Sequence, residues 1–202
     1  MAISFQYNKT ALQTLDKQLK VRERALPTLK NKESALRVEV KKAKDRATEL
    51  AVQYNEQISH YDSIARLWGE FDQNLIQIKG VELSSKKIAG VFTPVLDNIQ
   101  FETSTINLFN QPVWFTEGIA IIRSVAAIAI EREVFLRKME LLEFARKKTT
   151  QKVNLYEKVQ IPGFQDAIRK IKRFLEDQEN LSKSAQKIVK DRQEKQKQEA
   201  EQ

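Results

Sequence analysis

The segment LQTLDKQL, residues 12–19, begins the pattern that decides the fold of this chain. Its leucines stand alternately three and four residues apart, and the same spacing of apolar residues continues as far as Ile78. We call this run the first apolar pattern. A mean spacing of about 3.5 residues is typical of a helix that packs along another helix as a coiled coil. We therefore expect one helix from Asn8 to Ile78, about 100 Å long. Such a helix forms an extended rod and does not enclose a compact pocket.

The first apolar pattern has three polar exceptions, Arg22, Glu33 and Gln57. A polar residue in a coiled-coil seam can specify register, so these three are candidates for register control or for contacts with other proteins. Pro27 also lies inside the pattern, and an interior proline removes a helical hydrogen bond and usually kinks a helix. We expect the helix to continue through Pro27, because the pattern keeps its register on both sides.

A second apolar pattern begins after Thr116, a residue type suited to cap a helix N-terminus. It runs from Ile121 to Tyr156 and resumes, one residue out of step, from Ile161 to Val189. The slip predicts a local kink or change of supercoil where the sequence reads Ile161-Pro162-Gly163. Beyond Asp191 the chain is polar on all faces, and we expect it to fray.

Between the two patterns the composition changes. Residues 81–114 contain one glycine and two prolines, with Asp97-Asn98 as a turn signal. Two short runs, 88–92 and 99–103, are rich in β-branched and aromatic residues and predict a hairpin or small irregular lobe. Gly80 follows the last position of the first apolar pattern, where a helix C-cap is expected.

These observations predict a mainly α fold: a long antiparallel two-helix coiled coil with a small central β-hairpin lobe. The length match between two helices of about 70 and 80 residues favours pairing within the chain. The expected parts are an N-terminal long helix (1–79), a hairpin lobe (80–115), and a C-terminal long helix with a polar tail (116–202). Together they should form one continuous structural unit.

Residues that carry chemistry are scarce. The chain has no cysteine and one histidine, His60, so disulfides are excluded and a zinc site is disfavoured. Neither a Gly-x-Ser-x-Gly elbow nor a phosphate-binding glycine loop occurs. We expect no catalytic residue, no cofactor and no metal site. The N-terminus lacks a signal-peptide pattern, and the longest apolar run, 119–130, is too short to cross a bilayer, which needs about 20 residues. A cytosolic location is expected.

The net charge of +8 is uneven along the chain. Residues 1–46 carry twelve Lys/Arg against five Asp/Glu, whereas residues 61–118 carry four against seven. A basic helix can bind nucleic acid by phosphate neutralisation, but a solvated helix face is the simpler interpretation. Acidic residues are interleaved with the basic ones, and no aromatic residues alternate with them as on a base-stacking surface. The general alternatives are a non-catalytic coiled-coil adaptor and a nucleic-acid-associated scaffold.

Three segments resemble a known family. NKTAL (8–12), followed by LKNKESAL (29–36), is similar to a basic, leucine-spaced first helix with a Leu-Lys-x-Lys core. IAGVFTP (88–94) resembles an Ala-Gly-Val-x-x-Pro segment, and KVNLYEKVQIP (152–162) resembles an Arg-Val-Asn-x-x-Glu-x-x-x-Ile-Pro motif. All three, in this order, resemble the family of V-type ATPase D subunits. The third segment is the most specific, because coiled-coil composition alone would not produce it.

The resemblance implies the central rotor shaft of a rotary ATPase that couples ATP hydrolysis or synthesis to proton or sodium transport. The implied partners are the A and B subunits of the catalytic hexamer, the F subunit, and the funnel-shaped subunit that caps the membrane ring. The location implied is cytoplasmic, peripheral to the inner face of the cell membrane as part of the complex, with no nucleic acid and no membrane insertion.

We expect two groups of contact residues in such an assembly. The residues expected to face the hexamer, the first four through acidic loops, are Lys17, Lys20, Arg22, Arg24, Leu175 and Leu181. The residues expected to face smaller partner subunits are Ile88, Val91, Phe92, Trp114 and Tyr156. Trp114 is equally suited to anchoring the hairpin within the chain.

Overall fold

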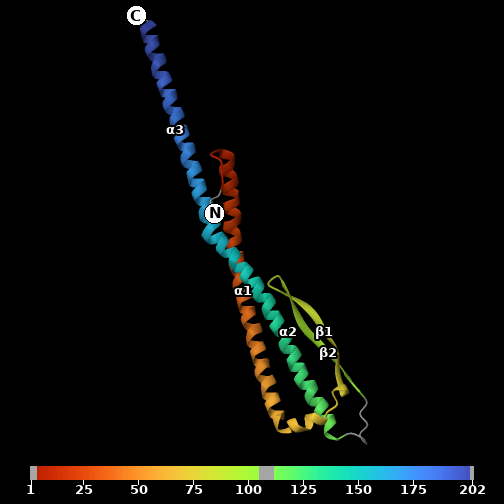
Figure 1. Cartoon of the computed structure of the whole chain (residues 1–202). Helices are drawn as coiled ribbons and strands as arrows, with labels where there is room; N and C mark the ends of the chain where they lie inside the picture. The colour runs from red at the N-terminus through yellow and green to blue at the C-terminus, as the bar shows by residue number, and fades with distance from the viewer. Residues whose placement is uncertain (1–3, 105–111, 201–202) are drawn as a thin grey trace. The chain divides into compact units, whose positions relative to one another are not determined.

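The computed structural model describes residues 4–104 and 112–200 (Figure 1). Its main elements are three α-helices and two β-strands, joined in part by 3₁₀ and π turns. In chain order they are α1 (Lys9–Tyr61), 3₁₀ helices η1 (Asp62–Glu70) and η2 (Gln73–Leu75), β1 (Ile76–Ile88), β2 (Val91–Thr103), α2 (Trp114–Asn154), the π-helix η3 (Leu155–Gln160) and α3 (Ile161–Ala200). The strands form one antiparallel two-stranded sheet. The predicted class, mainly α with a small β-hairpin, is confirmed.

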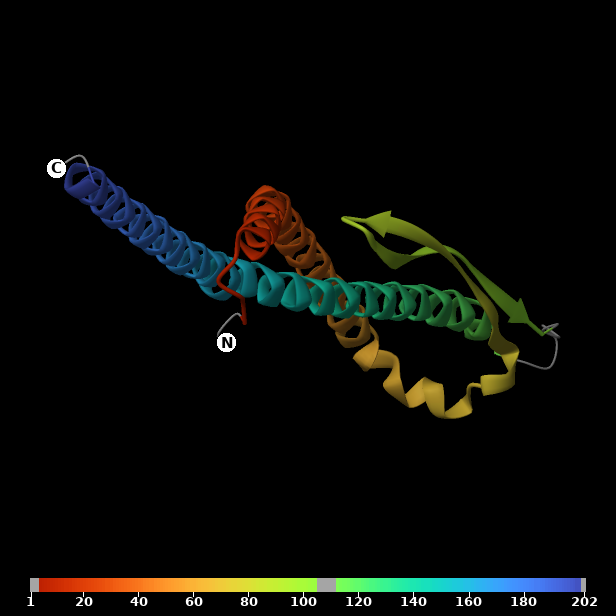
Figure 2. The ribbon, with the colours of Figure 1, turned by 90° about the horizontal axis from the view of Figure 1, so that it is seen from above.

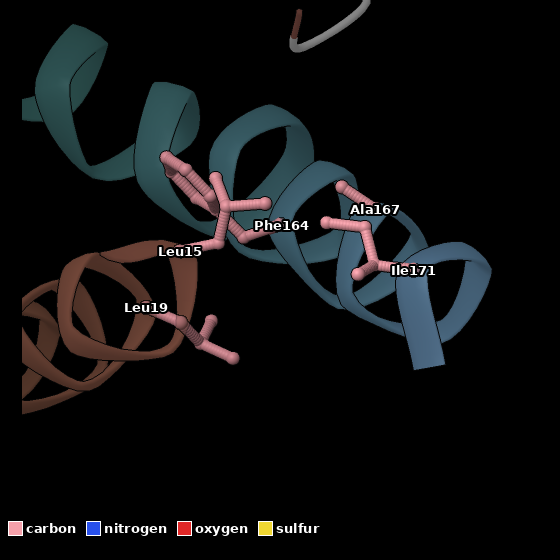
Figure 3. Close-up of a cluster of buried hydrophobic side chains, with 5 residues drawn as sticks. All are labelled: Leu15, Leu19, Phe164, Ala167 and Ile171. Atoms are coloured by element: carbon pink, nitrogen blue, oxygen red, sulfur yellow. The ribbon is translucent and has the colours of Figure 1, made fainter. Parts of the chain in front are cut away.

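The chain divides into two compact units, residues 1–30 with 150–202, and residues 31–149. The first unit contains the start of α1, the π-helix and α3. Its core is a cluster in which Leu15 and Leu19 of α1 face Phe164, Ala167 and Ile171 of α3 (Figure 3). Burial of each leucine or isoleucine side chain contributes about 1.5–3 kcal/mol, so this seam holds the two helices together.

Helix α3 continues past the start of α1 within this unit (Figure 1). Leu175 is half-buried, and every residue from Glu176 to Lys195 is exposed. The second apolar pattern extends to Val189, so its last turns have no helix of the described chain to cover them. We call residues 176–195 the α3 overhang. The backbone there is helical to Ala200, including the polar tail that was expected to fray.

The second unit contains the rest of α1, the hairpin and α2. Leu36, Ala43, Ala47 and Leu50 of α1 are buried, as is Leu142 of α2. Hydrogen bonds join residue 46 to residue 131 and residue 57 to residue 124, so the helices run antiparallel. The hairpin extends along α2, as the views of Figures 1 and 2 show.

The first apolar pattern marks the inner face of α1 throughout. Every position of the pattern from Leu12 to Tyr61 is buried or half-buried, including the three polar ones. Pro27 lies inside the helix on its exposed side, and the helix continues through it, as expected. The face of this helix was therefore readable from spacing alone.

The predicted end of the first helix is wrong. Helix α1 ends at Tyr61 and not near Ile78, and the chain passes through 3₁₀ turns into β1 at Ile76. The physical reason is a second core, in which Phe71, Leu75 and Ile76 pack against the start of α2. Burying these side chains requires the chain to turn back, and apolar spacing does not distinguish that turn from a continuing helix. Accordingly Gly80 is no C-cap, since it lies in β1 beside an irregularity in strand pairing.

The hairpin is longer than predicted, and its turn lies elsewhere. Each strand has 13 residues, and the run 88–92 contains the turn instead of forming a strand. Ala89 and Gly90 both have positive φ, of 48° and 82°, as the tight hairpin turns of this kind require. Asp97-Asn98, expected to form a turn, lies inside β2, where the pairing shifts between Glu82 and Leu83 and absorbs the extra residue.

Candidate functional site

The polar position Arg22 forms a clasp around the π-helix of the first unit. Its Nε donates a 2.7 Å hydrogen bond to Gln160 Oε1, and one terminal nitrogen donates to the carbonyl oxygen of Gln18. Its guanidinium carbon lies 4.5 Å from the ring centroid of Phe164 and 6.0 Å from that of Tyr156. A guanidinium so placed combines stacking with a directed hydrogen bond, which a lysine could not reproduce.

Lys30 makes a second link to the same segment. Its Nζ lies 2.7 Å from Glu157 Oε1, an ion pair between α1 and η3 with both side chains about half exposed. An exposed pair contributes only about 0–1 kcal/mol, so it orients the segment more than it stabilises it. Both contacts lie where the second apolar pattern slips by one residue.

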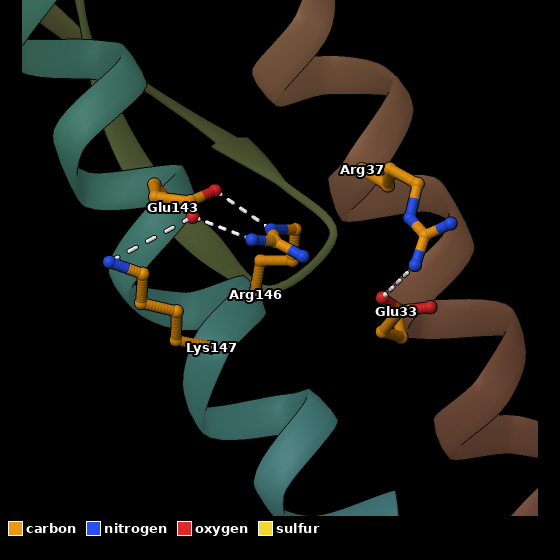
Figure 4. A network of polar contacts seen from close by, with 5 residues as sticks. All are labelled: Glu33, Arg37, Glu143, Arg146 and Lys147. Atoms are coloured by element: carbon orange, nitrogen blue, oxygen red, sulfur yellow. Dashed lines mark hydrogen bonds and ion pairs between the residues drawn. The ribbon is translucent and has the colours of Figure 1, made fainter.

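The polar position Glu33 belongs to a layer of charges in the second unit, shown in Figure 4. Arg146 of α2 donates two hydrogen bonds to Glu143, of 2.7 and 2.6 Å, and Arg37 donates one of 3.1 Å to Glu33. The bonds from Arg146 lower the pKa of Glu143 below its usual value, and Glu143 with the negative charge of Glu33 raises the pKa of Arg146. Charges of both signs therefore alternate between the helices at this level.

Further polar contacts across this helix pair lie farther along α1. Arg46 donates a 3.0 Å bond to Glu131 of α2 and a 3.3 Å bond to Glu49, and these two partners raise the pKa of the guanidinium. The polar position Gln57 accepts a 3.3 Å hydrogen bond from Ser124. Two of the three polar positions, Arg22 and Gln57, thus form hydrogen bonds to the second half of the chain, to Gln160 and Ser124. Their role in register control stays a prediction.

An aromatic cluster closes the end of the second unit where the hairpin begins. The ring centroid of Trp114 lies 5.5 Å from Trp68, 5.8 Å from Phe71 and 5.0 Å from Phe115. Gly118 lies beneath it, and a Cβ there would lie 3.1 Å from the rings of Phe71 and Trp114. Trp114 therefore packs within this chain, next to the first residues of β1.

Between the hairpin and α2 lies an open groove of about 1130 Å³. Strand residues 94–101 form one wall, and the other is one face of α2 from Ala120 to Lys138. Arg123, the charged residue within the apolar run of α2, lies with its guanidinium carbon 5.5 Å from the ring centroid of Phe101. At the tip, Gly90 lies against the ammonium of Lys32, so the hairpin contacts both helices of its unit.

The residues expected to face a hexamer differ in their availability. Lys17, Lys20 and Arg24 are exposed, and Lys20 pairs with Asp16 at 2.7 Å. Arg22 is half-buried in the clasp described above. Leu175 packs against the first unit's core, whereas Leu181, on the α3 overhang, is 71% exposed.

The residues expected to face smaller partners lie in three places. Ile88 and Val91 are half-buried beside the hairpin turn, and Phe92 is 65% exposed with Lys87 Nζ 5.4 Å from its ring centroid. Trp114 belongs to the aromatic cluster, and Tyr156 lies under Arg22. Within the second unit, the residues beside the hairpin turn and Trp114 lie at opposite ends of the hairpin, and Tyr156 belongs to the first unit.

Sequence reasoning missed the π-helix and the ion pairs Lys30–Glu157 and Arg46–Glu131. The one-residue slip in the second pattern was the available signal for the π-helix, and it was interpreted as a kink slightly downstream. In the described residues, no three His, Asp or Glu side chains are grouped to hold a metal. None of the described helices has the length and apolarity to cross a membrane.

Fold and contacts together define a class: a paired-helix protein with a lateral hairpin, whose distinctive features are long helix surfaces and polar contacts between the helices. The model of the family of ATP synthase D subunits matches residues 11–191, and the chain belongs to this family.

Curated relatives agree with this assignment. The chain is 34% identical to the V-type ATP synthase D subunit of Borreliella burgdorferi over 185 residues, covering 90% of this chain and 91% of the relative. It is 30% identical to the protein of the same name from Chlamydia abortus, over 89% of this chain and 88% of the relative. The similarity to the Chlamydia caviae protein has the same extent.

Proposed function

We propose that this chain is the central stalk, or rotor shaft, of a V-type rotary ATPase. In that role it couples ATP hydrolysis or synthesis in a hexamer of A and B subunits to proton or sodium transport through a membrane ring. Family membership supports a place in the complex. As a stalk the chain is non-catalytic itself and peripheral to the cytoplasmic face of the membrane.

The α3 overhang is the observation that carries this proposal. A lone helix exposing Leu181, Ile188 and Val189 has no covering partner in the described chain. Inside a hexamer of alternating A and B subunits, a single off-centre helix contacts the three catalytic sites unequally. A conformational equilibrium shifts only when contacts differ in free energy between its states, and an asymmetric shaft supplies that difference.

The basic start of α1 is the second surface assigned to the hexamer. Its exposed residues Lys17, Lys20 and Arg24 meet acidic loops of the hexamer in this proposal. Arg22 contributes indirectly, since its guanidinium contacts residues of this chain. Exposed charges give a salt-dependent attraction without deep anchoring, which suits a shaft that must turn.

The hairpin and neighbouring helix surface are assigned to the smaller partners, the F subunit and the funnel-shaped subunit of the membrane ring. Support comes from Phe92, which is exposed, and from the half-buried Val91 beside the turn. Replacing residues 83–97 by an Asn-Gly turn closes the strands at the Glu82–Asn98 pair and shortens the hairpin while its base stays in the aromatic cluster. We expect helix content to be retained by circular dichroism and binding of the F subunit or coupling to be lost. Full ATP-driven rotation with the short hairpin would refute this assignment.

Charge reversal tests the hexamer assignment directly. Lys17, Lys20 and Arg24 are changed together to Glu, and the variant is mixed with A and B subunits over a range of salt concentrations. We expect weaker assembly than with the native chain, with the difference shrinking at high salt as screening removes the attraction. Reversal of Lys41, Lys42 and Lys44, exposed residues of α1 in the other unit, is the matched control. Equal assembly at every salt concentration would contradict the proposal.

A further inference from the structure

The π-helix η3 interrupts two α-helices with a less favourable backbone conformation. Leu155–Gln160 lies between two long α-helices, and the flanking residues Asn154 and Ile161 both have α-helical backbone angles. The amide of Ile161 donates to the carbonyl of Tyr156, five residues earlier. A π-turn holds one more residue than an α-turn, is rare, and occurs frequently at functional sites.

The extra residue is visible in the burial of the side chains. Val153 is buried and Tyr156 half-buried, and the buried face resumes at Ile161 and Phe164. The step from Tyr156 to Ile161 is five residues, where the spacing of the pattern calls for four. Removing one residue from this segment would restore an unbroken pattern, so packing alone does not require the segment.

Polar contacts, and not apolar burial, hold the π-helix in place. None of its six residues is buried, and Leu155 and Val159 are 42% and 39% exposed. Its links to α1 are the bond from Arg22 to Gln160 and the ion pair of Lys30 with Glu157. Arg22 also stacks on Phe164 just beyond the segment. Such a turn needs only a few polar contacts to break before it can rearrange.

We propose that η3 is a register element: one stored residue, held by Arg22, through which α3 can shift by one residue along α1. Release of the Arg22–Gln160 bond frees the extra residue to move into the neighbouring turns. The two states then differ in which residues of α3 face α1. This inference rests on the proposed stalk function only for its role, which is to let the shaft change register while the complex turns over.

Two deletions test whether the stored residue is needed for folding. Deletion of Val159 removes the extra residue and leaves Tyr156, Glu157 and Gln160 in place. Deletion of Lys170, an exposed residue of α3, is the control, because it moves buried Ile171 out of the seam. In the full chain we expect the melting temperature to be unchanged or raised by the first deletion and lowered by the second. A comparable loss from both would overturn the proposal, since the π-turn would then be a structural necessity.

Hydrogen exchange tests the holding role of Arg22 without any partner subunit. In Arg22→Met we expect the amides of residues 155–161 to exchange about tenfold faster than in the native chain, since a charge-assisted bond is lost. Arg24→Met, at an exposed arginine of the same helix, should leave them unchanged. Equal exchange in both variants would overturn the proposal.

A proline variant separates the residue count from local sterics. Pro162 lacks an amide proton, and an interior proline distorts a helix by itself. In Pro162→Ala we expect residues 155–161 to keep the same exchange rates, because the residue count sets the π-turn. Slow exchange like that of the neighbouring α-turns would show that proline alone causes the turn and would overturn the proposal.

The complex shows whether the register element is used. The Val159 deletion is reconstituted with the other subunits, and assembly and ATP-driven ion transport are measured separately. We expect normal assembly with loss of transport. Full transport would overturn the assigned role. Failure of the native chain itself to assemble would count against the stalk function, while the exchange and melting results would still decide the register element.

Discussion

The two stretches of α3 on either side of Leu175 share one apolar spacing but differ completely in burial. Residues 161–175 place Phe164, Ala167 and Ile171 in a buried core, whereas Leu181 and Val189 are exposed. The spacing continues through both stretches, but two of its four positions in the overhang, Gln178 and Ser182, are polar. The burial differs because α1 begins at Lys9 and does not extend along the later turns of α3. An apolar pattern therefore indicates which face of a helix can pack against another helix. Whether that face is covered depends on how far the other helix extends.

The largest expected effect comes from truncating one side chain in each stretch. Ile171 is fully buried, so Ile171→Ala should lower the free energy of unfolding by about 2–5 kcal/mol. Leu181→Ala, at an exposed site, should change it by less than about 0.5 kcal/mol. Urea unfolding of the full chain measures both. Similar losses at the two sites would show that the overhang is covered in solution.

In the assembled complex, truncating a side chain of the overhang should have a large effect, unlike in the isolated chain. Leu181→Ala, nearly neutral in the isolated chain, should weaken binding to the A and B hexamer by about 1–2 kcal/mol if the side chain enters an apolar pocket. Titration of the variant against hexamer, with Ser182→Ala as the neighbouring control, gives the difference. Unchanged affinity would remove Leu181 from the contact surface.

Ion pairs sharpen the same comparison at a smaller scale. Glu131 links Arg46 across the helix pair at 3.0 Å, whereas Glu179 pairs with Lys183 along the overhang at 2.8 Å. We expect Glu131→Gln to cost about 0.2–1 kcal/mol, since its partner also bonds Glu49. Glu179→Gln should leave the urea midpoint unchanged. A larger loss at Glu179 than at Glu131 would contradict the packing assigned to the two regions.

The smallest effect is the pH dependence of the carboxylate Glu143. Its pKa is lowered by the bonds from Arg146, so the stabilisation is present above the unfolded-state pKa of about 4.3 and is lost as the pH falls through the folded-state value. Glu143→Gln should therefore flatten the acid side of the stability curve below about pH 4. Thermal melts from about pH 3 to 7 follow this, with Glu133→Gln, at an exposed residue of the same helix, as the control. An unaltered slope in Glu143→Gln would rule out its contribution.

Much of the fold followed from spacing, and the failures have definite physical causes. The inner face of α1, its passage through Pro27 and the presence of a hairpin were predicted correctly. The end of α1 was not, because Phe71 and Leu75 fit the apolar spacing and also fit a core beside Trp114. The free energy of forming that core decides whether the helix continues or the chain turns back. The hairpin turn was misplaced because Asp97-Asn98 is a stronger turn signal than Ala89-Gly90, yet strand pairing and its bulge absorb it.

The candidate site was predictable to a lesser extent. Its polar positions Arg22, Glu33 and Gln57 were visible as exceptions to the pattern, but their partners were not, since Gln160 is 138 residues from Arg22 along the chain. The roles assigned to Leu181 and Phe92 toward partner subunits stay predictions, although both side chains are exposed.

Periodicity along the chain was enough to predict that long helices form and which faces of them are apolar, and three short motifs indicated the family, because side-chain spacing and short motifs are local properties. Three features were decided by the tertiary structure: the early end of α1, the contact of Arg22 with Gln160 of the π-helix, and the line at Leu175 where burial stops. Each depends on which distant residues meet. The free energy of those contacts exceeds the conformational preference of each segment. It cannot be predicted from any one segment, because it depends on residues far apart in the sequence.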